Sequence, residues 1–286
     1  MNKMNITFYD SELKNLKKSY LLLKQRGVIG TAQSELEPGA FEDWLNAALI
    51  IQSSIYMIDS LYENETTIDT IIEKPMWKKV LQNISESEGS HNCDIGIAFE
   101  DLQRYADAER RIHAFDLIDS REFESILTLK CSDVRISRSL IWNYSKCNIG
   151  KRERNFWSVH DQCWELIEDL QDISEDGKDW NFNFWLYTFM AGHSANDGIR
   201  VVEQLLEFKA IILENIFISL PNSINPIYKI ALESTFNAIY KVKSDIYKIF
   251  IAIKSGKVIR FKHHIQYPIL SFPKENNFRI SAIGGT

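Results

Sequence analysis

Residues 164–178 read WELIEDLQDISEDGK, within a segment whose apolar residues recur with the 3.6-residue period of a helix. The stretch carries six acids, namely Glu165, Glu168, Asp169, Asp172, Glu175 and Asp176. No Lys or Arg occurs between Arg154 and Lys178. The sequence therefore predicts a helix that carries a strong negative charge with no base beside it.

The same helical period extends over most of the chain and predicts an all-α protein. The predicted helices cover residues 10–26, 40–64, 67–84, 98–116, 121–146, 153–174, 180–217 and 224–255. Breaks between them are expected at Arg26–Gly27, Glu37–Gly39, Gly150, Gly177 and Leu220–Asn222. Nothing marks a linker, so we expect a single helical domain over residues 1–256. An extended tail is expected over residues 257–286.

Composition excludes several classes of protein. A hydrophobic share of 45% with 12% aromatic residues is ample for a packed core. Only 12 Gly and 6 Pro disfavour sandwiches, barrels and glycine-rich phosphate loops. A formal net charge of −6 gives no reason to expect a nucleic-acid partner.

The four cysteines are dispersed and lack CxxC spacing, which favours reduced thiols over disulfides or a zinc site. The first fifteen residues contain no apolar signal-peptide region. No apolar run reaches the ~18 residues of a membrane span. We expect a soluble cytoplasmic protein without a transmembrane segment.

The acidic helix is unfavourable by itself. Its six like-charge pairs, spaced three or four residues apart, cost about 1–3 kcal/mol in an isolated helix. Acids near a helix C-terminus also oppose the macrodipole. A solvated face is the simplest alternative, but such a face usually interleaves bases. Trp157 and Trp164 continue the same arc, which is typical of the aromatic wall of a cavity beneath an acidic rim.

The acidic pattern occurs twice. Residues 55–63 read IYMIDSLYE and residues 164–172 read WELIEDLQD, with Ile, acid, Leu and acid at matching positions. The first copy also lies in a region, residues 27–73, that contains no Lys or Arg. Carboxylates one helical turn apart on two helices suit Mg²⁺, which prefers oxygen ligands and substrate phosphates. A di-iron site is a weaker alternative because it needs Glu-x-x-His pairs on the bundle helices, and His113 and His160 do not have that spacing.

Lys130 lies in a basic stretch between the two acidic motifs, and its predicted helical face carries Phe123, Ile126 and Val134. A lysine among apolar neighbours either extends its ammonium to solvent or meets an anion.

These segments together resemble the class I isoprenoid synthases, most closely the trans-prenyl diphosphate synthases and the terpene synthases built on that scaffold. DSLYE (residues 59–63) and EDLQD (residues 168–172) resemble the two aspartate-rich motifs of that family. ILTLKCSDV, which contains Lys130, resembles the family's lysine helix, and DGK (residues 176–178) resembles the acid and lysine that follow the second motif. The resemblance implies a single-domain helical bundle around a central active-site cavity, and it is compatible with a homodimer.

The resemblance also implies roles for individual residues. Three Mg²⁺ ions would be held by Asp59, Glu63, Glu168, Asp169, Asp172 and Asp176. The catalytic set would be Asp59, Glu63, Asp169 and Asp172. The substrate diphosphate would be bound by Lys130, Arg135 and Lys178. The cavity would be lined by Ser54, Ile55, Trp157 and Trp164.

The implied reaction uses one substrate. Chain-elongating synthases carry an Arg pair after the first motif, whereas residues 64–79 (NETTIDTIIEKPMWKK) contain no Arg. We therefore expect a Mg²⁺-dependent terpene synthase that ionises a linear prenyl diphosphate and releases diphosphate. In the resembled synthases, the residues four and five positions before the first motif limit the length of the product. The small Ser54 at one of these positions favours a C15 or C20 substrate.

Three alternatives stay open. One is a prenyl diphosphate synthase. Another is a head-to-head condensing enzyme of the squalene or phytoene type, whose second acidic motif QDISEDGK (residues 171–178) resembles. The last is a catalytically silent partner subunit, which Ser60 favours because the family has an acid at that position.

Overall fold

The computed structural model describes residues 10–62, 93–113, 120–145, 149–179, 182–191, 195–221 and 226–254. These residues are all helical, with no β-strand among them, so the predicted all-α class is confirmed. The helices are α1 (Asp10–Gln25), α2 (Val28–Glu35), α3 (Pro38–Tyr62), α6 (Cys93–His113), α7 (Ser120–Lys130), α8 (Ser132–Ser145), α9 (Lys151–Asp179), α10 (Phe184–Ala191), α11 (Ala195–Ile218) and α12 (Ile227–Lys254). The helix predicted over residues 67–84 and the tail predicted over residues 257–286 lie outside the described residues.

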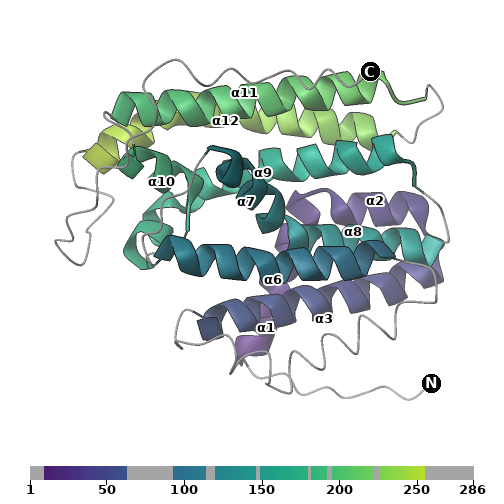
Figure 1. Cartoon of the computed structure of the whole chain (residues 1–286). Coiled ribbons are helices and arrows are strands. Elements are labelled where there is room, and N and C mark those ends of the chain that lie inside the picture. The colour runs from purple at the N-terminus through teal and green to yellow at the C-terminus, as the bar shows by residue number, and fades with distance from the viewer. Residues whose placement is uncertain are drawn as a thin grey trace.

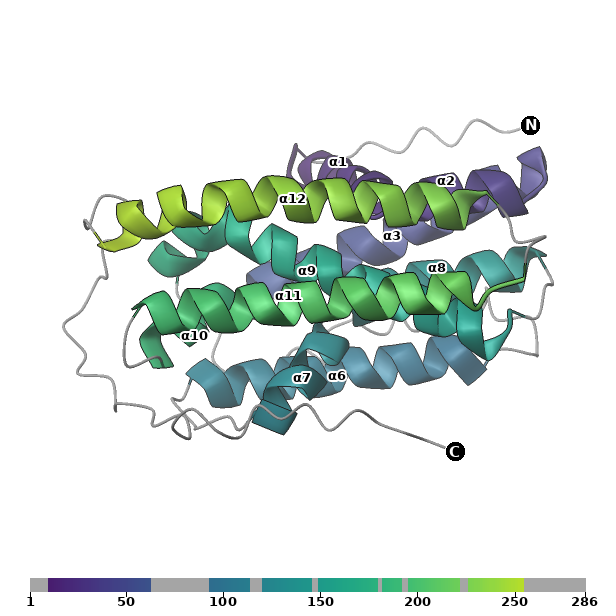
Figure 2. The same cartoon turned by 90° about the horizontal axis from the view of Figure 1, so that it is seen from above.

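The long helix α9 occupies the middle of the molecule (Figures 1 and 2). It packs against α11 and α12 on one side, and α7 and α10 also contact it. On the other side of the molecule α8 packs against α3, α6 and α2, and α1 packs against α3. The acidic motif of α9 therefore lies between two groups of helices rather than on the surface.

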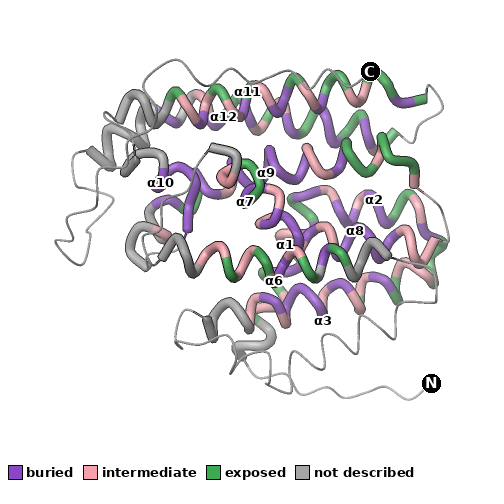
Figure 3. Tube along the Cα trace, in the orientation of Figure 1, coloured by how far each residue is buried: buried purple, intermediate pink, exposed green. Residues whose placement is uncertain are grey.

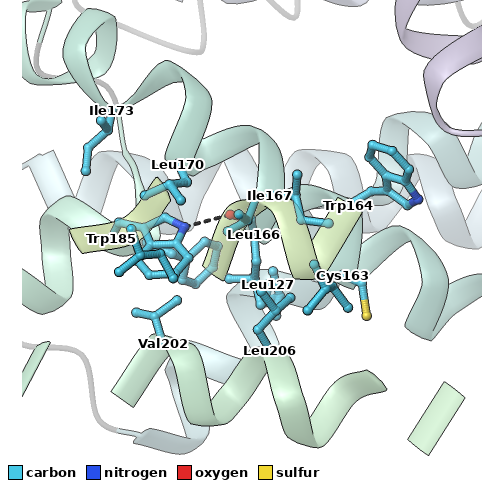
Figure 4. Close-up of a cluster of buried hydrophobic side chains, with 14 of the residues drawn as sticks. Leu127, Cys163, Trp164, Leu166, Ile167, Leu170, Ile173, Trp185, Val202 and Leu206 are labelled. Carbon is cyan, nitrogen blue, oxygen red and sulfur yellow. Dashed lines mark hydrogen bonds between the residues drawn. The ribbon is translucent and has the colours of Figure 1, made fainter. Parts of the chain in front are cut away.

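Two groups of apolar side chains stabilise these two sides. The group around α9 to α12 and α7 includes Leu127, Trp185 and Leu206, and Trp185 Nε1 donates a hydrogen bond to the carbonyl of Leu166 at 2.6 Å (Figure 4). The group around α1 to α3, α6 and α8 includes Trp44, whose side chain is fully buried. Each buried large apolar side chain contributes roughly 1.5–3 kcal/mol. Figure 3 shows in purple where the buried residues lie along these helices.

Several predicted helix breaks are confirmed. Gly27 adopts a left-handed conformation with φ of 68° and separates α1 from α2. Glycine tolerates this conformation because it lacks a Cβ. Pro38 is the first residue of α3, a position where its missing N–H is not needed. Gly150 and Pro221 both lie outside helices.

Other predicted boundaries are wrong. Helix α9 continues through Gly177, because a single interior glycine costs only about 1 kcal/mol. The helix predicted over residues 121–146 is divided at Cys131, next to which the Ser132 hydroxyl donates to the Leu129 carbonyl at 2.5 Å. The helix predicted over residues 180–217 is likewise two helices, α10 and α11. The short helix α2 was not predicted.

Candidate functional site

The acids of α9 that face the interior form one stripe, with Asp161, Glu165 and Asp169 spaced four residues apart. They are 2%, 8% and 4% exposed, so the acidic helix is not a solvated face. Each of these carboxylates meets a cation from another part of the chain. We call the three pairs the charge ladder, which consists of Arg138–Asp161, Arg26–Glu165 and Lys130–Asp169.

Arg26 is buried because the turn at Gly27 directs the chain from α1 into α2 at this point. Its Nη2 donates to Glu165 Oε2 at 2.6 Å, and its Nε donates to Glu168 Oε1 at 2.9 Å. A second contact joins Nη2 to Glu168, and Nη1 donates to the carbonyl of Asp161 at 2.8 Å. Burial alone would lower the pKa of Arg26, but Glu168 and Glu165 raise it, so the guanidinium stays charged.

Lys130, the last residue of α7, contacts two carboxylates of the stripe. Its Nζ donates to Asp169 Oδ1 at 2.6 Å and lies 3.3 Å from Glu165 Oε1. The ring centroids of Phe182 and Phe184 lie 5.8 Å from the ammonium. Burial would lower the pKa of Lys130, yet Asp169 and Glu165 raise it. Of the two possibilities left open for this lysine, the structure shows the contact with an anion, and that anion is a carboxylate of the protein.

Asp169 also binds the start of α10. Its Oδ2 accepts a hydrogen bond from the N–H of Phe184 at 2.8 Å, where the helix dipole favours negative charge. Burial nevertheless raises the pKa of Asp169 to about 7, against the opposing attraction of Lys130. The carboxyl thus joins three helices, α7, α9 and α10.

Asn183 fixes this junction. Its Oδ1 accepts hydrogen bonds from the N–H groups of Trp185 and Leu186, as the N-cap of α10. Its Nδ2 donates to the Asp169 carbonyl at 2.5 Å and to Asp176 Oδ2 at 2.7 Å. The cap therefore ties the start of α10 to the C-terminal half of α9.

Arg138 of α8 binds Asp161 with both arms of its guanidinium. Nε lies 2.9 Å from Oδ2 and Nη2 lies 2.8 Å from Oδ1, the bidentate geometry of strong ion pairs. Nη2 also donates to the Arg26 carbonyl at 2.6 Å, and the guanidinium carbon lies 4.0 Å from the Trp157 ring centroid. Burial would raise the pKa of Asp161, but Arg138 lowers it well below its usual range.

His160 lies beside this pair and is neutral. Its Nδ1 is 3.0 Å from Asp161 Oδ1 and 3.4 Å from Arg138 Nη2. Burial lowers the pKa of His160 to about 4, and the nearby arginines add to that effect. The imidazole therefore does not contribute a cation to the ladder near neutral pH.

The polar interior extends from α9 to α3 through Asp133 and Gln52. Gln52 is fully buried and its Nε2 donates to Asp133 Oδ2 at 2.7 Å. Burial and the nearby Glu165 raise the pKa of Asp133 to about 6. Gln52 Oε1 lacks a hydrogen-bond partner in the described structure.

The acidic residues predicted to bind metal have different surroundings in the structure. Asp169 lies in the ladder and Glu168 binds its Arg26, whereas Asp172 is exposed and Asp176 contacts Asn183. The side chains of Asp59 and Lys178 and the whole of Glu63 lie outside the described residues. The facing of the two acidic motifs therefore stays a prediction.

Arg135 faces away from the carboxylates of α9 and binds α6 instead. Its Nη1 donates to Asp101 Oδ2 at 3.0 Å, and its Nη2 donates to the Thr128 carbonyl at 3.1 Å and to Ser132 Oγ at 2.6 Å. These contacts stabilise the α7–α8 junction.

The four predicted cavity residues come from two helices, α3 and α9, and their lining of one cavity stays a prediction. Ser54 donates to the Ile50 carbonyl at 2.7 Å, and Ile55 belongs to the apolar group around α3. Trp157 packs under Arg138, while Trp164 Nε1 donates to Thr235 Oγ1 at 3.1 Å. Both tryptophans are buried, but Trp164 packs in the group around α9 to α12 and α7, whereas Trp157 packs in a third, smaller apolar group with Phe156 and Tyr228.

The carboxylates of the ladder do not form a preformed metal centre. Within the part of the chain that the structure describes, no three His, Cys, Asp or Glu side chains converge as metal ligands. Glu168 and Asp169 instead bind Arg26 and Lys130. Oxygen donors of this kind suit Mg²⁺ chemically, but here they stabilise protein cations.

The prediction missed Arg26 and Arg138, which provide two of the three ladder cations. A signal existed for Arg138, because Val134 and Ile141 flank it on the same helical face. The argument that singled out Lys130 applies there too. No local pattern distinguishes Arg26, whose burial depends on the turn at Gly27.

Comparison of the chain with protein-family models, with curated proteins and with solved structures finds no significant match in any of the three. Among the described helices, none combines the length and apolar character that crossing a bilayer requires. The function therefore has to be inferred from the residues of the site and their geometry.

Proposed function

We propose that the protein is a class I isoprenoid synthase-type enzyme that ionises a linear C15 or C20 prenyl diphosphate and releases diphosphate. The observation that carries the proposal is the 2.6 Å contact between Lys130 Nζ and Asp169 Oδ1. The resemblance assigns these two residues, 39 positions apart, to one diphosphate site on separate motifs. Their contact in the interior of an all-α bundle supports that assignment.

Lys130 would bind the substrate diphosphate. Its raised pKa keeps the ammonium charged, and an anion of higher charge than a carboxylate can compete for it. The carboxylate of Asp169 would then keep its hydrogen bond from the N–H of Phe184, and Asn183 would still bind the backbone carbonyl of Asp169. The rings of Phe182 and Phe184 lie beside the ammonium, where they can also face a carbocation.

Magnesium enters the proposal only through the resemblance, which assigns it to Asp59, Glu63, Glu168, Asp169, Asp172 and Asp176. When bound, it would act as a Lewis acid on the departing diphosphate. The ion-paired state of Glu168 and Asp169 is not that of a metal site.

The test is incubation with Mg²⁺ and geranyl, farnesyl or geranylgeranyl diphosphate, each with and without isopentenyl diphosphate. Diphosphate release and extractable hydrocarbons are measured. Product from one substrate alone is expected. A requirement for isopentenyl diphosphate would indicate the elongating alternative, and a product with twice the carbon number would indicate head-to-head condensation.

Lys130→Met and Lys209→Met form a matched pair for this assay. Lys209 is also buried and ion-paired, to Glu124 at 2.5 Å, but it belongs to α11. We expect Lys130→Met to lower diphosphate release at least about a hundredfold and Lys209→Met to lower it little, with circular dichroism verifying the fold of both. Equal activity of the two variants would contradict the role of Lys130.

A catalytically silent helical partner is the second candidate. The observation that favours it is that Arg26 and Lys130 already neutralise the acids that metal ions would bind. This candidate predicts no diphosphate release from any of the three substrates by a correctly folded protein, which is the outcome that would end the first proposal.

A further inference from the structure

Helix α1 has a solvent-exposed face, of which Lys18 also contacts the ring of Tyr56 in α3. Lys14, Lys17, Lys18, Leu21 and Lys24 are all exposed and follow one helical stripe. The opposite side of α1 is buried at Ser19 and Leu23. Helix α1 lies at one edge of the molecule (Figure 2), and the exposure of these five residues shows that the stripe faces solvent. We call these five residues, together with the neighbouring Tyr20, the α1 face.

The α1 face combines positive charge with exposed apolar surface. Leu21 is 62% exposed and Tyr20 is 40% exposed, so neither contributes much to the core. Lys18 lies 4.3 Å from the ring centroid of Tyr56, and no carboxylate among the described residues pairs with any of the four lysines. The face is therefore a concentrated positive surface on a protein whose formal net charge is −6.

We propose that the α1 face docks the protein on an anionic membrane surface. Leu21 and Tyr20 would enter the interface between headgroups and acyl chains, and the four lysines would lie at the level of the lipid phosphates. A basic helix face with apolar side chains at its centre is the pattern of an interfacial helix, and lysine stems extend along apolar surface while their ammonium groups stay at the headgroups. Charge complementarity identifies the partner as an anionic lipid surface.

A nucleic acid fits the face less well. An exposed leucine between the lysines gives a phosphate backbone no partner, and the net negative charge of the whole protein opposes a polyanion that extends beyond one helix. A membrane presents anionic headgroups above an apolar layer, which matches both components of the face. The proposal does not depend on the enzymatic function proposed above.

The test is flotation of the full chain with vesicles of phosphatidylcholine alone and of phosphatidylcholine mixed with phosphatidylserine, at low and high salt. Binding is expected only to the mixed vesicles and is expected to weaken with salt.

The charge variant is Lys17→Glu with Lys24→Glu, and the apolar variant is Leu21→Ser. Because each lysine near such a surface contributes about fivefold in affinity, the charge variant should lose at least tenfold. Leu21→Ser should lose severalfold.

Three exposed positions elsewhere give two matched controls. Lys151→Glu with Lys229→Glu changes the same net charge on α9 and α12, and Ile218→Ser removes a 72% exposed apolar side chain from α11. Both controls should bind like the unaltered protein. The proposal is overturned if the unaltered protein does not bind mixed vesicles at low salt, or if the controls lose as much as the α1 variants. It is also overturned if a DNA duplex binds the α1 face and the mixed vesicles do not.

Discussion

At the scale of single residues, the charge ladder consists of charged side chains that are shielded from water and form ion pairs with one another. Glu165 contacts both Arg26 and Lys130, and these cations in turn bind Glu168 and Asp169. Burying such a pair contributes little net stability, but removing one partner leaves a charge without compensation. Loss of a single ladder residue should therefore cost far more than loss of a surface charge.

Arg26→Met should destabilise the protein by about 3–5 kcal/mol, because it leaves Glu165 and Glu168 buried without their guanidinium. Lys24→Met is the control two residues earlier, in the last turn of α1, and its exposed side chain should change stability by less than about 0.5 kcal/mol. Both values are measured by urea unfolding. Adding Glu165→Gln to Arg26→Met should restore part of the loss. Equal effects of the two single variants would contradict the structural importance of the ladder.

Two titrating groups near the ladder act on stability in opposite directions. The folded-state pKa of His160 is lowered to about 4, so between about pH 4 and 6.5 the unfolded chain binds more protons at this residue and stability rises with pH. The folded-state pKa of Asp133 is raised to about 6, so between about pH 3.8 and 6 the folded protein binds more protons and stability falls as pH rises. The two slopes oppose each other between about pH 4 and 6.

Asp133→Asn removes one of these slopes. From pH 4 to pH 6 the variant should gain roughly 3 kcal/mol of stability relative to the unaltered protein, from a pKa shift of about two units at 1.36 kcal/mol each. Gln52, Glu165 and Arg26 surround Asp133 and are the same in both proteins. Urea unfolding at a series of pH values measures the difference. Parallel stability curves would show that Asp133 titrates normally.

At the scale of elements, the break between α1 and α2 directs Arg26 to the ladder. Gly27→Ala should cost about 1–2 kcal/mol, because φ of 68° disfavours any residue with a Cβ. The added Cβ would meet no atom within 4 Å, so the cost is purely conformational. Gly39→Ala is a matched control in the first turn of α3, also without a contact, and should be neutral or stabilising by up to about 1 kcal/mol. Equal stabilities of the two variants in urea unfolding would refute this account.

The helical class could be predicted because apolar period and glycine or proline breaks are local signals. Gly27 and Pro38 both mark real boundaries. The division at Cys131 depends on side-chain hydrogen bonds of Ser132 with the backbone, which periodicity does not include. At Gly177 a break was predicted but is absent, because the surrounding helix outweighs the low helix propensity of one glycine.

The charge balance of α9 could not be predicted from its own sequence. Neighbouring positions contain no base, and this absence suggested metal ions as the missing cations. The cations that the described structure places beside Asp161, Glu165 and Asp169 are residues 138, 26 and 130, which lie far away in sequence and meet α9 only through the packing of helices. Magnesium binding stays a prediction. Lys130 could be singled out because its own helical face is apolar, and Arg138 has the same property. The partner of either residue could not be predicted.

At the scale of the whole molecule, two pairs of the ladder join the two apolar groups. Arg26 and Arg138 come from the side of α1 to α3 and α8, whereas Glu165 and Asp161 belong to α9. Lys130 and Asp169 both come from the side of α7 and α9. We predicted a single domain over residues 1–256. Such a domain unfolds cooperatively if unfolding of one side exposes buried charges on the other.

This coupling predicts how the molecule unfolds. In native-state hydrogen exchange with increasing urea, amides of α3 and α11 in the unaltered protein should show the same free energy of opening. Replacing both Arg26 and Arg138 by Met should lower that free energy for α3 more than for α11, because α9 keeps its apolar contacts with α11 and α12. Mass spectrometry of peptides from the two helices measures both values.

Lys209→Met separates loss of stability from loss of coupling. Lys209 and Glu124 join α11 to α7 within one apolar group, so this variant should lower the opening free energies of α3 and α11 together. If α3 and α11 already open separately in the unaltered protein, the ladder is not what unites the two sides. If they still open together after both arginines are replaced, apolar contacts alone unite them. Only separation by the arginine replacements, and not by Lys209→Met, assigns the coupling to the buried charges between the two groups.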